Sequence, residues 1–181
     1  MMNIQKKYKY KNFVFVLIND FSLIAFSNAI EPLRLANRQA QKEIYTWKLM
    51  SENGENVKCS SGFLFKVDSP VSQIDNDDFV ILCAGQNIKK NTTKKLLNWI
   101  RKESRKKIYI GSICTGTYVL AKAGLINDIP STIHWENREA LKEEFEHLNI
   151  SDAIYTIDKK WFSAAGGTAS IDLMLNIISQ D

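Results

Sequence analysis

The sequence predicts an α/β fold in which helices cover both faces of a mainly parallel sheet. Three short apolar runs, at residues 13–18, 79–83 and 107–110, are bounded by polar or glycine residues, as buried parallel strands are. Helical patterns of apolar residues lie between these runs. The chain has 181 residues, 45% of them hydrophobic, which is enough for one domain that buries roughly 70% of its unfolded surface. We therefore expect a single domain over residues 1–181, folded as a flavodoxin-like three-layer sandwich.

The first half of the chain alternates between strand and helix patterns. A helix follows the strand at 13–18, because apolar residues recur there at the spacing of one helix face. The residues with this spacing are Phe26, Ala29, Ile30, Leu33 and Ala36. Residues 45–51 form a shorter strand candidate, and the buried strand at 79–83 follows it.

The second half repeats this alternation. Leu96, Leu97 and Ile100 predict a helix whose N-cap is Asn91 or Thr92. The remaining predicted elements are a strand at 107–110, a charged helix at 136–147, short strands at 153–158 and 160–165, and a final helix at 166–179 that begins with a glycine pair. Strands that alternate with helices in this way favour a parallel sheet.

Composition indicates the cellular compartment. The apolar runs are far shorter than the ~20 residues that a membrane-spanning helix needs, and the N-terminal residues lack the pattern of a signal peptide. Cys59, Cys83 and Cys114 are an odd number of cysteines without metal-ligand spacing, which favours a reducing compartment over a disulfide framework. We therefore expect a cytoplasmic protein that contacts no membrane and holds no metal or other cofactor.

The charge distribution is mildly basic. The net charge is +4, and basic residues cluster at 6–11, 89–95 and 101–107. We interpret all three clusters as solvated surface, because no helix-turn-helix, zinc-finger or RNA-binding motif accompanies them.

Three segments are expected to meet at the carboxyl edge of the sheet, where ligands gather in such folds. They are the turn after the first strand, the stretch CAGQN at 83–87 and the stretch SICTG at 112–116. Cys114 then lies where a strand turns sharply into a helix, so its thiol projects from the backbone and the positive helix end lowers its pKa. A buried structural cysteine is the other interpretation, and the S-x-C-x-G spacing alone does not decide between them.

Longer phrases of the sequence resemble a known family. The stretch ICTGTYVLAKAGLINDIPSTIHW at 113–135 is similar to the cysteine elbow of the ThiJ/PfpI superfamily, whose domain is like that of class I glutamine amidotransferases. Segments at 21–38, 60–62, 132–135 and 164–175 further resemble the N-terminal domain of GlxA-like transcription regulators of the AraC family. The resemblance spans nearly the whole chain and implies a class I glutamine amidotransferase-like fold.

The resemblance also implies partners. In that family a DNA-binding module of two helix-turn-helix units follows this domain, and the 181 residues of this chain, which ends at Asp181, contain no such module. The expected role is ligand sensing and dimerisation for a transcription regulator. The expected partners are a small-molecule effector of the nitrogen-containing metabolite class, a second copy of the chain, and DNA only through the C-terminal module.

A missing acidic residue argues against catalysis. Enzymes of this superfamily pair the elbow cysteine with an acid of the first helix, and the resemblance puts Ala25 at that position. An alanine neither accepts a hydrogen bond nor moves a proton. Glu31 lies six residues farther along the helix, about 120° away around its axis, and is not expected to substitute. We therefore expect no catalytic activity, with Cys114 and His134 as vestigial catalytic candidates.

The expected ligand-binding residues lie on three segments of the carboxyl edge: Gly85, Gln86, Cys114, Thr115, His134 and Trp135. Gly85 keeps one backbone donor of the kind that binds an oxyanion, while Ala84 replaces a second glycine that the enzymes often have. The resemblance places His134 beside Cys114, where it takes the thiol proton or, as we favour, anchors a ligand or serves the structure. Trp135 is a pocket wall or, as we expect, a core residue.

Two other functions stay open at this point. The first is an active hydrolase, hydratase or glyoxalase-like enzyme that uses Cys114 and His134, and the second is a dimerisation module without a ligand. Among the remaining candidates, Cys59 and Cys83 are expected to be inert and buried. His147 is expected at a solvated helix end, and the glycine pair at 166–167 to serve close packing rather than anion binding.

Overall fold

Seven strands form one sheet in the computed structural model, which describes residues 11–180. In the order of their pairing they are β5 (Ser69–Pro70), β2 (Tyr45–Ser51), β1 (Lys11–Leu17), β6 (Phe79–Cys83), β7 (Tyr109–Ile113), β9 (Trp161–Ala164) and β8 (Tyr155–Asp158). All neighbouring strands are parallel except β8 and β9. The predicted mainly parallel, flavodoxin-like sheet is therefore confirmed.

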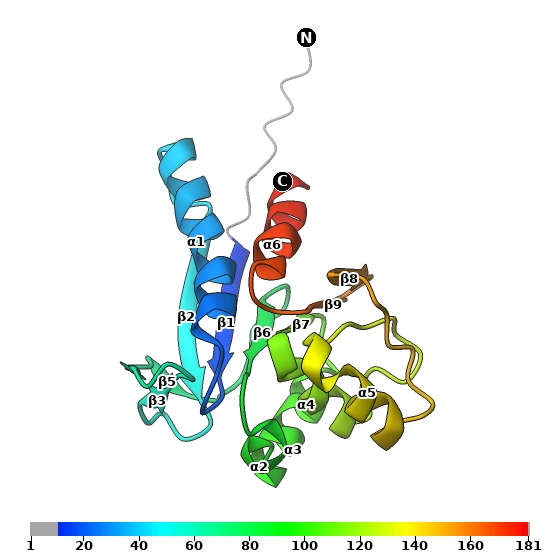
Figure 1. The fold of residues 1–181 in the computed structure, drawn as a ribbon. Coiled ribbons are helices and arrows are strands. Elements are labelled where there is room, and N and C mark those ends of the chain that lie inside the picture. The colour runs from blue at the N-terminus through cyan, green and yellow to red at the C-terminus, as the bar shows by residue number, and fades with distance from the viewer. Residues whose placement is uncertain (1–10, 181) are drawn as a thin grey trace.

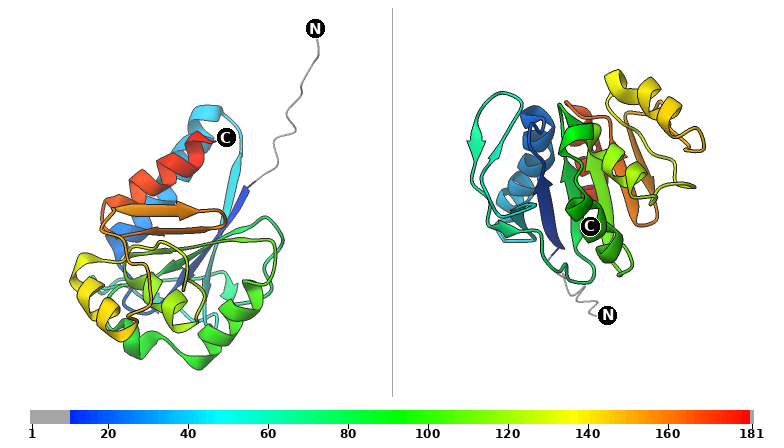
Figure 2. Two further views of the ribbon diagram at one scale, coloured as in Figure 1. Left: turned by 90° about the vertical axis from the view of Figure 1, so that its right-hand side faces the viewer. Right: turned by 90° about the horizontal axis from the view of Figure 1, so that it is seen from below.

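Helices cover both faces of this sheet (Figures 1 and 2). They are α1 (Leu23–Ala40), α2 (Ile88–Asn91), α3 (Lys94–Glu103), α4 (Thr117–Lys122), α5 (Trp135–Glu144) and α6 (Ala169–Ser179). Helices α1 and α6 lie side by side over one face, where Phe13 and Phe15 of β1 are buried. Val14 and Val16 belong to the core on the other face, with residues of α3, α4 and α5. This period of two is expected of a strand that is buried on both faces.

The start of α3 differs from its prediction. Its N-cap is Thr93, whose hydroxyl accepts the third helical N–H at 3.1 Å, and neither Asn91 nor Thr92 has this role. Asn91 instead closes α2, and its side chain donates to the Asn19 carbonyl at 2.7 Å. The separate helix α2, which the periodicity did not reveal, is the physical reason for the displaced cap.

Other element boundaries also differ from the predictions. The strand predicted at 107–110 lies at β7, and the helix predicted at 136–147 ends at Glu144, because the chain leaves helical geometry at Phe145. The predictions also missed β5 and a two-stranded hairpin of β3 (Val57–Lys58) and β4 (Leu64–Phe65). These strands are only two residues long, too short to show a period.

The basic clusters have different environments. The cluster at 101–107 is mostly exposed, as predicted, whereas Lys89 and Lys90 of the second cluster line pockets. The cluster at 6–11 lies outside the described residues except for Lys11. No helix within residues 11–180 is long and apolar enough to cross a membrane.

Gly85 sets the spacing of two loops at the carboxyl edge. A Cβ at this position would lie 2.2 Å from the Asp20 carbonyl oxygen and 2.7 Å from the Ser22 nitrogen, both of them backbone atoms. The two loops are hydrogen-bonded here, with Ser22 N–H donating to the Ala84 carbonyl at 3.1 Å and Gln86 N–H to the Asp20 carbonyl at 3.0 Å. The close approach therefore requires glycine, because any larger side chain at position 85 would collide with the backbone of the loop after β1.

We predict that Gly85→Ala destabilises the protein by about 3 kcal/mol, because the clash is with backbone that cannot move without breaking the loop pairing. Urea unfolding measures the change. Gly124→Ala is the control, since open space surrounds Gly124 and its φ of +71° costs an alanine only about 1 kcal/mol. Equal losses for the two variants would contradict the prediction.

Candidate functional site

Cys114 lies on a strained turn between β7 and α4. Its φ is +58°, a region that non-glycine residues seldom adopt and that costs about 1–2 kcal/mol. The elbow interpretation predicted a sharp turn from strand to helix at this residue, and the turn that joins β7 to α4 is a short 3₁₀ helix over Cys114–Gly116. A Cβ on Gly116 would lie 2.4 Å from the Leu82 carbonyl oxygen, so glycine allows the turn to pack against β6.

The thiol of Cys114 is held in its neutral form. The residue is only 6% exposed, and burial raises the pKa of its thiol to about 11. The Thr115 N–H and the Ser22 hydroxyl, which stabilise a thiolate by hydrogen bonding, lower the pKa, and the negative charge of Glu136 raises it. The sequence-based expectation of a lowered pKa is therefore wrong, because loss of solvation outweighs the helix end and the two donors.

The acidic partner of the enzymes has no equivalent in α1. Ala25 is completely buried in the same apolar cluster as Cys114. Glu31 is exposed and forms an ion pair with Arg34 at 2.5 Å, which lowers the pKa of its carboxyl. The polar neighbour that α1 supplies is Ser22, its N-cap, whose side chain also accepts the Ala25 N–H at 3.4 Å. A hydroxyl with an ordinary alcohol's acidity does not replace a carboxylate as a proton acceptor.

His134 lies beside the elbow through its backbone. Its N–H donates to the Cys114 carbonyl at 3.1 Å, and its Nδ1 lies 3.7 Å from a carboxylate oxygen of Glu136. Within residues 11–180, no hydrogen bond joins the imidazole to the Cys114 thiol. The arrangement therefore contains no formed thiol–imidazole pair, although both side chains border the same cavity.

A cavity of about 500 Å³ opens in front of the elbow. It is lined by Ser22, Ser60, Gly85, Gln86, Asn87, Ile88, Lys89, Lys90, Cys114, Thr115, His134, Glu136 and Asn137. Five of the six predicted ligand-binding residues are in this set, and Trp135 is not. The Gly85 carbonyl accepts the Thr115 hydroxyl at 2.6 Å, which ties the elbow to the β6 loop. We call this cavity the elbow pocket.

A charged cluster holds one wall of the elbow pocket. Lys89 of α2 pairs with Glu144 of α5 at 2.7 Å, and Lys122 of α4 lies 3.3 Å from the same carboxylate. Tyr118 donates its hydroxyl to Glu144 at 2.8 Å. Burial, followed by the hydrogen bond to Glu144 and its charge, raises the pKa of Tyr118 to about 12. The cluster joins three helices around the pocket, and α2 depends on it for one of its anchors.

Several sequence predictions have a different outcome at this site. Trp135 is 68% exposed at the first position of α5, so the expectation of a core residue is wrong. Its ring centroid lies 5.7 Å from that of His134, and its predicted ligand role stays a prediction. His147 is exposed, as expected, but lies beyond the end of α5 and not on it.

The predictions about buried residues agree with the structure. Cys59 and Cys83 are each 1% exposed and, like Cys114, form no disulfide. Burial raises the pKa of Cys83 well above its ordinary value. A Cβ on Gly166 would lie 2.8 Å from Cys114, so the close packing expected of the glycine pair holds for Gly166; a Cβ on Gly167 would meet no atom within 4 Å, and the expectation is wrong for that residue. No group of three or more potential metal-ligating side chains occurs in residues 11–180.

Sequence reasoning missed more than half of the pocket lining. Ser60 belongs to a phrase that carries the family resemblance, and Glu136 and Asn137 directly follow His134 and Trp135, so these positions had a sequence signal. Lys89 and Lys90 did not, because a short basic helix resembles solvated surface until its partners are known.

The family assignment follows from comparison with known proteins. The sequence profile of the DJ-1/PfpI family matches residues 11–180. The chain belongs to the DJ-1/PfpI family. It is 37% identical over 170 residues to the HTH-type transcriptional regulator CdhR of Pseudomonas aeruginosa, covering 94% of this chain and 50% of CdhR. It is 35% identical over 167 residues to the HTH-type transcriptional regulator GlxA of Rhizobium meliloti, covering 92% of this chain and 52% of GlxA.

The chain therefore spans about half the length of the curated relatives that it matches. Among solved structures, an AraC family transcriptional regulator from Pseudomonas putida superposes with a TM-score of 0.82 at 24% identity, over 94% of this chain and 91% of that chain. This likeness confirms the DJ-1/PfpI fold, which is that of class I glutamine amidotransferases.

One enzyme is also similar over a shorter stretch. Isonitrile hydratase of Pseudomonas putida is 30% identical over 87 residues, which cover 48% of this chain and 37% of the enzyme. DJ-1/PfpI relatives thus include both regulators and an enzyme, and the family assignment alone does not separate the two roles.

We predict that Cys114 alkylates slowly at neutral pH, with a rate that rises about tenfold per pH unit toward pH 11, because only the thiolate reacts. Among the three cysteines it reacts first, since neither Cys59 nor Cys83 borders the elbow pocket. Iodoacetamide labelling followed by peptide mass spectrometry measures both, with Cys114→Ser as the control. An apparent pKa below 8, or faster labelling of another cysteine, would contradict the buried, neutral thiol.

Proposed function

We propose that this chain is the effector-sensing domain of an AraC-type transcription regulator and that it catalyses no reaction. The observation that carries the proposal is a neutral elbow thiol, without a carboxylate in α1, at the base of a cavity large enough for a small metabolite. The similarity to CdhR and GlxA over nearly the whole chain supports it. DNA recognition would then belong to a C-terminal module like that of the longer relatives.

The lining of the elbow pocket supports a polar effector. Gln86, Asn87 and Asn137 offer amide donors and acceptors, and Lys90 and Glu136 carry opposite charges. A nitrogen-containing metabolite with hydrogen-bonding groups meets this lining better than an apolar molecule, which leaves the amides unpaired. The predicted positions remain the proposed ligand-binding residues, five of them in the lining and Trp135 outside it.

Sensing requires that the effector binds two states of the domain with different affinity. An effector with equal affinity for both states does not shift the equilibrium between them. The wall formed by α2 is the element best suited to this difference. It has four residues, and Lys89 is tied to Glu144 while Asn87 donates to the Asp20 carboxylate at 2.9 Å. A helix of one turn has little stability of its own, so these contacts decide its position.

We predict that Gln86→Trp abolishes effector binding without unfolding the domain, since Gln86 is exposed at the pocket mouth. A thermal-shift screen of nitrogen-containing metabolites identifies effectors, and one present at 100 times its Kd adds about 2.7 kcal/mol of stability. Gln73→Trp, at an exposed loop position outside the pocket, is the control and keeps the shift. An effector whose shift survives Gln86→Trp binds elsewhere and contradicts the assignment.

The same screen, extended to turnover, separates sensing from catalysis. The alternative function is a hydrolase, hydratase or glyoxalase-like enzyme using Cys114 and His134, and the similarity to isonitrile hydratase favours it over other chemistries. Isonitriles, glyoxals and small amides are the substrates to assay. Turnover that disappears in Cys114→Ser would replace the sensor proposal with the enzyme.

We also propose that the domain forms a homodimer, because regulators of this class commonly read paired half-sites. An apolar groove of about 370 Å³ between α1 and α6 supports this proposal, with Leu35 and Leu175 exposed on its two sides. Helix α6 ends at the C-terminal end of the described chain (Figure 1), so this face would bring the two following modules into one assembly.

We predict that Leu175→Asp converts the dimer to a monomer at tens of micromolar protein, since a charge is costly in a buried apolar interface. Sedimentation velocity measures the mass. Ile24→Asp is the control, because Ile24 is similarly exposed on α1 but does not line the groove. A wild-type monomer would refute the dimer, and a dimer that survives Leu175→Asp would refute this face.

A further inference from the structure

A single ion pair joins two walls of the elbow pocket. One wall is α2, which carries Lys89, and the other is α5, whose first turn carries Glu136 and Asn137. Lys89 pairs with Glu144, the last residue of α5, at 2.7 Å. Within residues 11–180, no other ion pair or hydrogen bond joins these two helices. The partner of Lys89 therefore decides whether the two walls are tied together.

This ion pair can be exchanged at little cost. The side chain of Lys89 is 65% exposed and that of Glu144 is 26% exposed, and an ion pair that is open to water is weak because water and salt screen it. Without Lys89, Glu144 keeps two other donors, the Tyr118 hydroxyl at 2.8 Å and the Lys122 ammonium at 3.3 Å. An anion that takes Lys89 from Glu144 therefore does not leave the Glu144 carboxylate unpaired.

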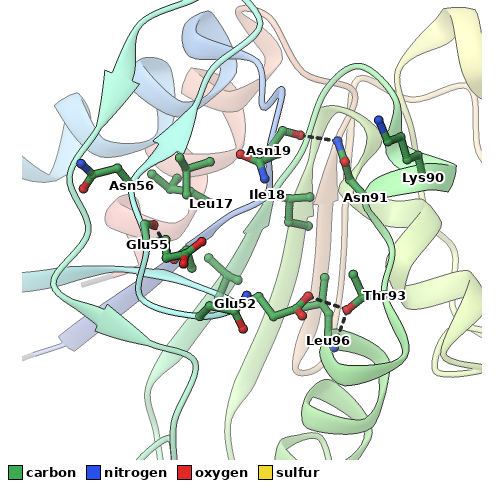
Figure 3. A pocket seen from close by; sticks show the side chains of 14 residues that line it. Leu17, Ile18, Asn19, Glu52, Glu55, Asn56, Lys90, Asn91, Thr93 and Leu96 are labelled. Atoms are coloured by element: carbon green, nitrogen blue, oxygen red, sulfur yellow. Dashed lines mark hydrogen bonds between the residues drawn. The ribbon is translucent and has the colours of Figure 1, made fainter.

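Other carboxylates near α2 have partners of their own. Asp20 accepts the side-chain amides of Asn87 and Asn91 at 2.9 Å and 3.4 Å, which hold both ends of α2 to the loop after β1. Figure 3 shows Glu52 in a neighbouring, smaller cavity, where it accepts the Thr93 hydroxyl at 2.5 Å. The contacts of α2 with the loop after β1 are thus separate from its link to α5, and the link to α5 is the one that a ligand of the elbow pocket can change.

We propose that the elbow pocket binds an anionic group of its effector at Lys89 and that this group takes the place of Glu144. Lys89 and Lys90 bring two ammonium groups to the lining, and the negative charge of Glu136 disfavours an anion on the α5 side. The bound anion unties α2 from α5, so the filled and empty domains differ in the link between the two walls. This difference supplies the two states that sensing requires, and the inference in this respect rests on the proposed sensor function.

The test uses acetate and acetamide, which have the same shape and differ in charge. Each is titrated at tens of millimolar and constant ionic strength into the isotope-labelled chain, and backbone amide shifts report where it binds. We expect acetate to shift residues 88–91 together with residues 143–145, because Lys89 leaves Glu144 when acetate binds. Acetamide should not shift residues 143–145, since a neutral amide does not replace a carboxylate as the partner of an ammonium group.

Removing the competing carboxylate distinguishes exchange from structural support. In Glu144→Gln no carboxylate competes for Lys89, so acetate should bind about threefold more tightly, whereas a residue that only supported the pocket would weaken binding when changed. Glu139→Gln is the matched control, because Glu139 lies on the same helix and pairs with Lys142 at 3.3 Å outside the pocket lining. This control should leave the acetate affinity unchanged.

Lys89→Gln decides whether the gain passes through the lysine. Acetate should bind this variant more weakly, and adding Glu144→Gln to it should no longer strengthen binding. Three results would overturn the proposal: an acetate affinity that does not rise in Glu144→Gln, a rise that persists without Lys89, or acetate shifts that acetamide reproduces at residues 143–145. None of these measurements uses an effector, so their failure is distinct from failure of the sensor proposal, which the Gln86→Trp experiment tests.

Discussion

The close packing of backbone around Cys114 is the constraint on which the site depends. Three glycines allow it: Gly116 against the Leu82 carbonyl, Gly166 against Cys114 itself, and Gly85 against the Asp20 carbonyl, each at a distance that excludes a Cβ. These contacts join the ends of β1, β6, β7 and β9 into one rigid edge. The left-handed conformation of Cys114 persists because its neighbours hold it there. The same packing buries the Cys114 thiol, so the sharp turn and the raised pKa of the thiol have one cause.

Burial also sets the protonation state of the Cys114 thiol. A thiol pKa of about 11 lies well above neutral pH, so the protonated form predominates there. The donors that would favour the thiolate, Thr115 N–H and the Ser22 hydroxyl, are present but outweighed. The elbow forms part of the lining of the pocket, together with hydrogen-bonding groups from Ser60 to Asn137.

The sheet, its parallel strands and the elbow could be predicted because each produces a local pattern in the amino-acid sequence. Short continuous apolar runs identify β1, β6 and β7, and small residues at 112 and 116 permit the turn at Cys114. The prediction failed where structure depends on partners distant in sequence. Helix α2 exists because Asp20 and Glu144 hold it, and Ser22 meets Cys114 only in the folded chain. Trp135 is a predicted core residue, yet it begins a helix whose other face packs inward. The sign of the thiol's pKa shift follows from burial, which no motif encodes.

Helix α2 joins the loop after β1 to one wall of the elbow pocket. At its end, the Asn91 side chain donates to the Asn19 carbonyl at 2.7 Å, and Lys89 pairs with Glu144 of α5 at 2.7 Å. A helix of one turn is too short to be stable by itself, so these contacts with distant parts of the chain decide where it lies. The position of this wall of the elbow pocket therefore depends on side-chain contacts and not on the sheet.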